Sequence, residues 1–190
     1  MKKIISVLIL SIVFITGLTG KENPVSFSAG LSTGIPFYGS KETDRINKSL
    51  ENPGRFIIGA YGNINFNIIE QGTLFLGADL LSDFIWNNDY HSNHIHFSMP
   101  VGFKIYPNLQ GLCFGIAYTL GFRADFIDTV DVYKKEIPCW GNGFKLFTEY
   151  NFAKYGKSKY LPIIGFSWNL MPRGGNAYDN IINFYIGANF

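Results

Sequence analysis

Bulky apolar residues alternate with polar or small residues along most of the chain, and no helical periodicity persists after the first twenty residues. A period of two is the pattern of a β-strand with one apolar face. The last segment shows this pattern clearly. Its apolar face carries Ile182, Phe184, Ile186, Ala188 and Phe190, and its other face carries Ile181, Asn183, Tyr185, Gly187 and Asn189. The alternation therefore predicts an all-β protein.

Eight segments of this kind follow one another along the chain. They begin near Val25, Phe56, Thr73, Asn93, Leu112, Gly143, Tyr160 and Asn180. Each is long enough for the roughly 9–11 residues that a tilted strand needs to cross a bilayer. The connections at 69–72, 107–111 and 153–158 are short, whereas those at 36–53, 85–92, 127–141 and 171–179 are longer and polar. Short periplasmic turns and long outer loops are typical of outer-membrane barrels, so we predict an eight-stranded antiparallel up-and-down transmembrane β-barrel.

The glycines indicate which face of the sheet points inward. Many stand on the polar or small face, at Gly30, Gly59, Gly77, Gly102, Gly115, Gly121, Gly165 and Gly187. Small residues relieve crowding inside a barrel of eight strands, which has little interior room. The bulky face then meets lipid, where a closed barrel pairs every backbone group. The alternative is a soluble lipocalin-like barrel or sandwich.

Aromatic residues near the ends of the segments fit the interfacial girdles of a membrane barrel. We expect these girdles to contain Trp86, Tyr90, Tyr106, Trp140, Tyr160 and Trp168.

The N-terminal residues predict export. Lys2 and Lys3 precede an apolar run from 4 to 18, and the small residues Thr19 and Gly20 follow it. This order is typical of a secretory signal peptide, which we assign to 1–20. The alternative, an uncleaved membrane anchor, has too short an apolar run for the roughly 20 residues of a spanning helix. Residues 21–190 then form one barrel domain.

Charge and cysteine content narrow the class further. Without Lys2 and Lys3 the 16 basic residues become 14, which equals the 14 acidic residues. A balanced charge argues against a nucleic-acid partner, because phosphate binding needs a basic excess. Cys113 lies just after a short turn, Cys139 lies in a long outer loop, and a predicted strand of about a dozen residues separates them. A disulfide needs Cα atoms within about 7 Å, so we predict no bond between them.

Charged residues on the inward face form the main candidate site. By alternation, the lumen face carries Asp79, Lys104, Arg123, Asp125, Lys145 and Glu149. Charges removed from water need partners, so we expect an ion-pair network that fills and plugs the lumen. The alternative is the selectivity lining or gate of a narrow pore for small or apolar solutes.

Histidines supply two further candidates. His91, His94 and His96 are close enough in sequence to suggest a zinc or copper site, although ordinary polar residues at a barrel rim are expected more often. His96 and Ser98 resemble the His-x-Ser motif of outer-membrane lipid A deacylases, in which histidine would activate a hydroxyl nucleophile. The glutamate expected about a dozen residues later is missing, since Asn108, Leu109 and Gln110 stand there. We therefore expect no enzymatic activity, no cofactor and no bound metal.

The signal peptide, the eight alternating segments and the aromatic C-terminal residue together resemble the small outer-membrane barrels of the OmpA, OmpX and OmpW type. The start of the chain and its Asn-rich composition also resemble uncharacterised barrels of spirochaetes. This resemblance implies that Phe184, Ile186 and Phe190 form the signal read by the outer-membrane assembly machinery. It also implies a bacterial outer-membrane location and contact with outer-membrane lipid. We expect a structural or surface-interaction role, in which the long loops contact a host or envelope partner.

Overall fold

The computed structural model describes residues 24–39, 53–88, 90–107, 111–129, 133–135, 139–152, 162–173 and 177–190. The predicted signal peptide at 1–20 lies outside these residues and stays a prediction. Among the described residues, no helix is long and apolar enough to cross a membrane.

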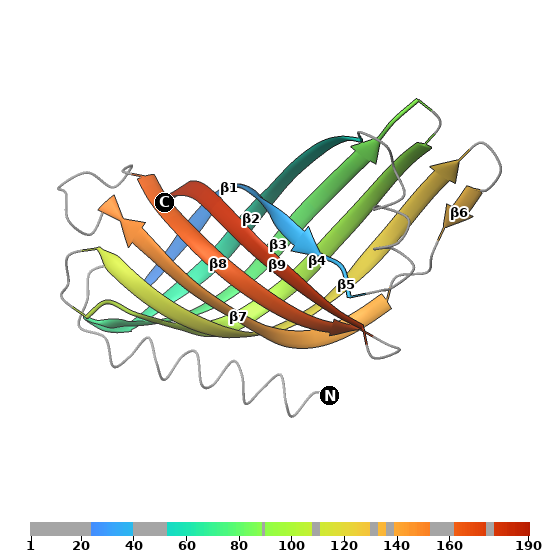
Figure 1. Ribbon diagram of the computed structural model, residues 1–190. Coiled ribbons are helices and arrows are strands. Elements are labelled where there is room, and N and C mark those ends of the chain that lie inside the picture. Colours follow the sequence, from blue (N-terminus) through green and yellow to red (C-terminus); the bar gives the residue numbers. More distant parts are fainter. Residues whose placement is uncertain are drawn as a thin grey trace.

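The described residues form nine antiparallel strands that wrap around one lumen (Figure 1). Their bounds are β1 Val25–Phe37, β2 Gly54–Ile69, β3 Gly72–Trp86, β4 Tyr90–Ile105, β5 Leu112–Thr129, β6 Tyr133–Lys135, β7 Cys139–Asn151, β8 Pro162–Arg173 and β9 Ala177–Asn189. Neighbours in sequence pair with each other, and β7 pairs with β5 past the short β6. The pairing of β1 with β9 closes the barrel. The predicted barrel of eight membrane strands is thereby confirmed, with β6 as a short addition against the end of β5.

Backbone hydrogen bonds tie the last residue into the closing seam. Phe27 N donates to Phe190 O at 3.2 Å, and Phe190 N donates to Phe27 O at 2.8 Å. We call the end of the barrel that holds this pair the terminal end and the opposite end the far end. The start of β1 and the end of β9 therefore lie at the same end of the barrel, as an even number of strands requires.

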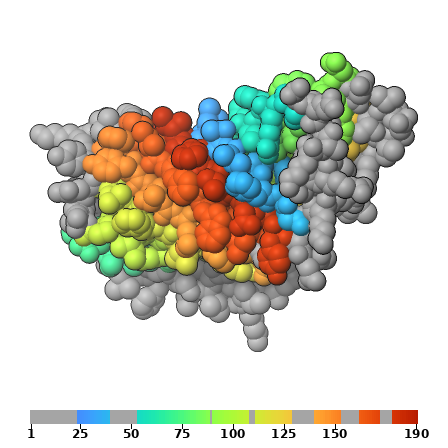
Figure 2. Space-filling model, viewed as in Figure 1, coloured from blue at the N-terminus to red at the C-terminus, as the bar shows by residue number. Residues whose placement is uncertain are grey.

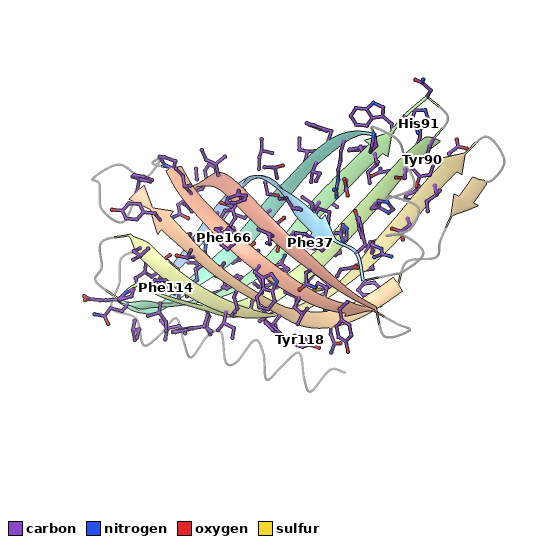
Figure 3. All side chains as sticks on the ribbon, viewed as in Figure 1. Phe37, Tyr90, His91, Phe114, Tyr118 and Phe166 are labelled. Carbon is purple, nitrogen blue, oxygen red and sulfur yellow. The ribbon has the colours of Figure 1, made fainter. Side chains whose placement is uncertain are left out.

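The outer wall is apolar and the lumen is mostly polar. Leu31 and Ile116 are 61% and 57% exposed, and Figure 3 shows Phe114 and Tyr118 on the outside of the wall. Asp83 and Ser167, in contrast, are fully buried inside the barrel. A wall of exposed apolar side chains is unfavourable in water and favourable in hydrocarbon. The soluble lipocalin-like alternative, which needs the apolar face inside, is therefore wrong.

Inward-facing glycines make room for large side chains of the next strand. A Cβ at Gly165 would lie 2.1 Å from the ring of Tyr185, and one at Gly115 would lie 2.0 Å from the ring of Phe147. No carbon atom fits at such distances, so the glycines allow these two rings to lie across the lumen. The narrow interior is filled by alternating large and small residues, as expected for eight strands.

Two of the predicted girdle residues lie elsewhere. Tyr90 and Tyr106 are only 5% and 3% exposed, because the even-numbered residues of β4 face the lumen and Tyr106, directly after β4, continues this alternation. Trp86 and Trp140 do face outward, and Tyr160 lies outside the described residues. The girdle prediction was therefore wrong for Tyr90 and Tyr106, whose positions in the alternation already placed them inside.

The contrast between short turns and long loops is also weaker than predicted. The expected loops at 85–92 and 171–179 are mostly strand, since β3 runs to Trp86, β4 begins at Tyr90, β8 runs to Arg173 and β9 begins at Ala177. The connection that contains 153–158 is longer than expected, because β7 ends at Asn151 and β8 begins at Pro162. Many of the polar residues that were predicted to form loops at 85–92 and 171–179 therefore belong to the ends of strands.

Candidate functional site: the packed lumen

Aromatic and small side chains close the terminal end of the lumen. Phe75, Tyr106, Cys113, Ala117 and Phe147 form one buried cluster there. The rings of Phe75 and Phe147 meet edge to face, with centroids 5.5 Å apart and planes at 88°. Such a cluster fills part of this end of the lumen with packed side chains.

Two ion pairs lie inside the lumen and contact this aromatic cluster. Lys104 Nζ is 2.9 Å from Glu149 Oε1, and Lys145 Nζ is 2.7 Å from Asp79 Oδ2. The hydroxyl of Tyr185 donates to Glu149 Oε2 at 3.1 Å. Because Lys104 and Glu149 are nearly fully buried, each charge depends on the other for its neutralisation.

The aromatic rings also stabilise the lysines. Lys104 Nζ lies 5.2 Å from the ring centroid of Phe75 and 5.7 Å from that of Phe147. Lys145 Nζ lies 5.9 Å from the ring centroid of Phe147. A cation over an aromatic face is favourable at these distances, so the ion pairs and the aromatic cluster form one continuous plug.

A second cluster, which we call the far-end cluster, centres on Arg123. Its Nη1 is 2.7 Å from Asp179 Oδ1 and its Nη2 is 3.0 Å from Asp125 Oδ2. The other oxygen of Asp125 lies 2.7 Å from Nδ1 of His94. These four side chains come from β4, β5 and β9 and cross the lumen from wall to wall.

Tyr38, which lies just beyond the end of β1, covers this cluster. Its hydroxyl donates to Asp83, which also accepts two hydrogen bonds from Arg55 at 2.7 and 2.8 Å. The Tyr38 ring stacks on His96 at 5.7 Å and lies 5.2 Å from the guanidinium of Arg123. Burial and, secondarily, the neighbouring Asp83 raise the pKa of Tyr38 far above its usual value. The hydroxyl therefore stays protonated and remains a donor to Asp83.

Each of the six charged residues predicted to line the lumen lies inside it. Two of the pairs are Lys104 with Glu149 and Lys145 with Asp79, and the third is Arg123 with Asp125. The predicted network did not include five further members: Tyr38, Arg55, Asp83, His94 and Asp179. Asp83 lies four residues after Asp79 and therefore on the same face of the strand. Extending the predicted strand by a few residues would have identified it.

The histidines do not form a three-residue metal site. His94 and His96 face the lumen, whereas His91 faces outward at the far end of β4 (Figure 3). Among the described residues, no group of three His, Cys, Asp or Glu side chains could hold a metal ion. His94 instead pairs with Asp125.

The pair His96 and Ser98 lies where a membrane lipid does not reach. The side chains are only 4% and 8% exposed, and both point into the lumen.

The two cysteines lie far apart on neighbouring strands. Cys113 is in register with Glu149, and Cys139 is in register with Arg123. Ten residues of β5 separate these two positions, or about 33 Å at roughly 3.3 Å per residue. This separation is several times the distance that a disulfide can bridge.

A small polar cavity remains between the two ion pairs. Its volume is about 40 Å³, and its lining includes Asp79, Lys145, Glu149, Asn169 and Asn183. One ordered water needs about 10–15 Å³ by the same measure, so the cavity holds a few water molecules at most.

No protein-family model and no curated protein matches this sequence. Its fold, however, matches that of solved outer-membrane proteins. The attachment invasion locus protein Ail of Yersinia pestis superposes with a TM-score of 0.60 at 9% identity, over 87% of this chain and 97% of Ail. Neisserial surface protein A gives 0.49 at 9% identity, over 88% and 98% of the two chains. OprG of Pseudomonas aeruginosa gives 0.47 at 8% identity, over 87% and 95%.

The fold and the apolar outer wall define this chain as a small bacterial outer-membrane β-barrel protein. The predicted similarity to small barrels of the OmpA type is thereby confirmed at the level of the fold. The spirochaetal resemblance stays a prediction.

Proposed function

We propose that this protein is a surface-interaction protein of the outer membrane, in which a closed barrel carries a binding surface at its far end. The observation that supports this role most directly is the unequal height of the barrel wall. β5 pairs with β4 up to Thr129, whereas β7 begins to pair with β5 only at Arg123. The far-end parts of β2, β3, β4 and β5, together with β6, therefore project beyond the other strands (Figure 1). We call this projection the tall wall.

The outer face of the tall wall combines aromatic and polar side chains. Trp86, His91 and Asp128 stand side by side in register, and Phe84, Asn93 and Phe126 form the next row toward the membrane. The two rows border a shallow hollow of about 440 Å³. Exposed aromatic residues next to polar ones are common at protein binding sites. We assign this end to the extracellular side, since the terminal end of such barrels is periplasmic.

The proposed partners follow from this orientation. The barrel wall contacts outer-membrane lipid, and the tall wall contacts a host or envelope molecule. The outward residues Phe184, Ile186 and Phe190 of the last strand would be read by the assembly machinery during insertion. Their exposure of 54%, 55% and 66% makes them accessible from the lipid side. We propose no enzymatic role, no cofactor and no nucleic-acid partner.

Attachment to cells tests the binding role. We expect a non-adherent bacterium that displays this chain to bind host-cell monolayers several-fold better than the same strain without it. The double variant Trp86→Ser and His91→Ser should lose this gain. Ile69→Ser, an exposed position at the terminal end, is the matched control and should keep it. Equal attachment with and without the displayed chain would refute the proposal.

Conductance in planar bilayers tests the closed lumen. We expect no steady channels from the folded protein, since the aromatic cluster, the ion pairs and the far-end cluster fill the barrel along its length. The boiled protein is the control for leakage caused by detergent. Steady, resolved channels from the native sample would instead support the alternative, a narrow pore for small solutes.

A further inference from the structure

The ladder between β1 and β2 ends before either strand does. It stops at Ser32 and Gly59, although β1 continues to pair with β9 as far as Phe37 and β2 continues to pair with β3 as far as Gly54. All residues on both sides of this gap belong to the described part of the chain. The wall is therefore split between 33–37 and 54–58.

Pro36, four residues beyond the last pair at Ser32, keeps the ladder from continuing to the end of β1. Phe27 exchanges its backbone hydrogen bonds with Phe190, which directly follows β9. The backbone N–H and C=O groups of the odd-numbered residues of β1 therefore point toward β9, and those of the even-numbered residues point toward β2. Pro36 is even-numbered and has no N–H group to donate to β2. Thr33 makes a substitute bond, in which its Oγ1 donates to the carbonyl oxygen of Ile57 at 2.8 Å. Tyr38 anchors the end of β1 to Asp83 of β3, on the lumen side.

A groove runs over this split on the outside of the barrel. Its volume is about 500 Å³, and it spans β2, β1, β9 and β8. The apolar side chains of its lining are Leu31, Phe56, Ile58, Ile164, Phe184 and Ile186. Each of these is between 42% and 61% exposed. Figure 2 shows this face, with β1 in blue between β2 in cyan and the orange and red strands β8 and β9. We call it the lateral groove.

The surroundings of the lateral groove determine what fills it. The groove lies on the same apolar wall that faces the membrane, so hydrocarbon is the medium in contact with it. A polar guest would lose its hydration and gain few side-chain partners, since most of the lining is apolar, the hydroxyl of Thr33 donates to Ile57 and that of Tyr185 donates to Glu149. We propose that the lateral groove is a binding site for one acyl chain of an outer-membrane lipid, which it retains longer than the rest of the wall does.

The groove is shallow and open toward the membrane, and a layer of side chains separates it from the lumen. Ser32 and Tyr185 line both the lateral groove and the lumen cavity, so a single layer of residues separates the two. Tyr185 is held in this layer by its hydrogen bond to Glu149. An acyl chain in the groove therefore meets a wall of packed side chains. This inference depends on the membrane-facing fold and goes beyond the proposed binding role of the tall wall.

Retention of lipid through detergent exchange tests the site. The full mature chain is refolded into vesicles of dioleoylphosphatidylglycerol and dioleoylphosphatidylethanolamine, with a photo-crosslinking phenylalanine analogue at position 31 or 116. Leu31 lies in the groove, whereas Ile116 has a similar exposure on β5. After exchange into lipid-free detergent and illumination, mass spectrometry should find several-fold more lipid adduct at position 31.

Two variants at Thr33 separate filling of the groove from loss of a hydrogen bond. Thr33→Trp should fill the groove and remove most of the adduct at position 31. Thr33→Val keeps the shape, loses the bond to Ile57 and should retain the adduct. A gel shift between boiled and unboiled samples verifies that each variant is folded. Equal adduct at 31 and 116, an unchanged yield with Thr33→Trp, or a crosslink to peptide in place of lipid would each overturn the inference.

Discussion

Replacing Arg123 by methionine should destabilise the folded barrel by about 3–5 kcal/mol, the usual range when one partner of a buried ion pair is removed. Arg123 lies between Asp125 and Asp179, whose side chains are 2% and 0% exposed. Without the guanidinium, two buried carboxylates would face each other across the far end of the lumen. Methionine has a similar length, so most of the loss would come from charge rather than from an empty cavity. Urea titration in lipid vesicles, followed by the gel shift of the folded form, measures the change.

A second substitution in the same cluster identifies the cause of this loss. Asp179→Asn removes one of the two carboxylates and keeps the size of the side chain. Adding it to Arg123→Met should therefore recover a large part of the lost stability. If the double variant were as unstable as the sum of both single variants, charge imbalance would not be the cause. Arg123→Lys should lie in between, because a lysine cannot contact both carboxylates with the same fork geometry.

The alternation of the sequence predicted the wall and the lumen lining of this barrel well, for a physical reason. In a β-strand the side chain at each second position points to the same face. Lys104 and Glu149 lie on the polar faces of their strands, and in a barrel with an apolar outer wall these faces point into the lumen. Their lumen positions followed from the same period that placed Leu31 and Ile116 outside.

Strand ends and cross-lumen partners were harder to predict. Asp179 lies in the polar stretch 171–179, which was predicted as a loop, and Asp83 lies just past the last residue that was assigned to its predicted strand. Tyr38 contacts Asp83 although 45 residues separate them in sequence. Which residues meet across a lumen depends on the stagger of the strands, and a single sequence carries no direct record of it. Pro36 was a usable signal, since proline weakens the ladder toward the neighbour that its nitrogen faces.

A double-mutant cycle on Lys104 and Glu149 should separate a plugged lumen from a hydrated one. We expect Lys104→Met and Glu149→Gln each to lower the unfolding free energy by about 3–5 kcal/mol, because each leaves a buried charge without its partner. Glutamine keeps an acceptor for the hydroxyl of Tyr185, and methionine suits the space between the rings of Phe75 and Phe147. The double variant should therefore be nearly as stable as the native protein, which gives a coupling energy of several kcal/mol.

The size of this coupling energy depends on whether side chains or water and salt surround the ion pair. In a lumen filled with water and salt, the same two charges would behave like a surface pair, and the coupling would fall to about 1 kcal/mol or less. A large coupling would indicate that the pair is dry and that side chains, rather than solvent, fill the barrel at this level. A small coupling, together with steady channels in planar bilayers, would favour a pore and turn Lys104 and Glu149 into its lining. Because the cycle compares variants of one folded barrel, its result does not depend on which partner the tall wall binds.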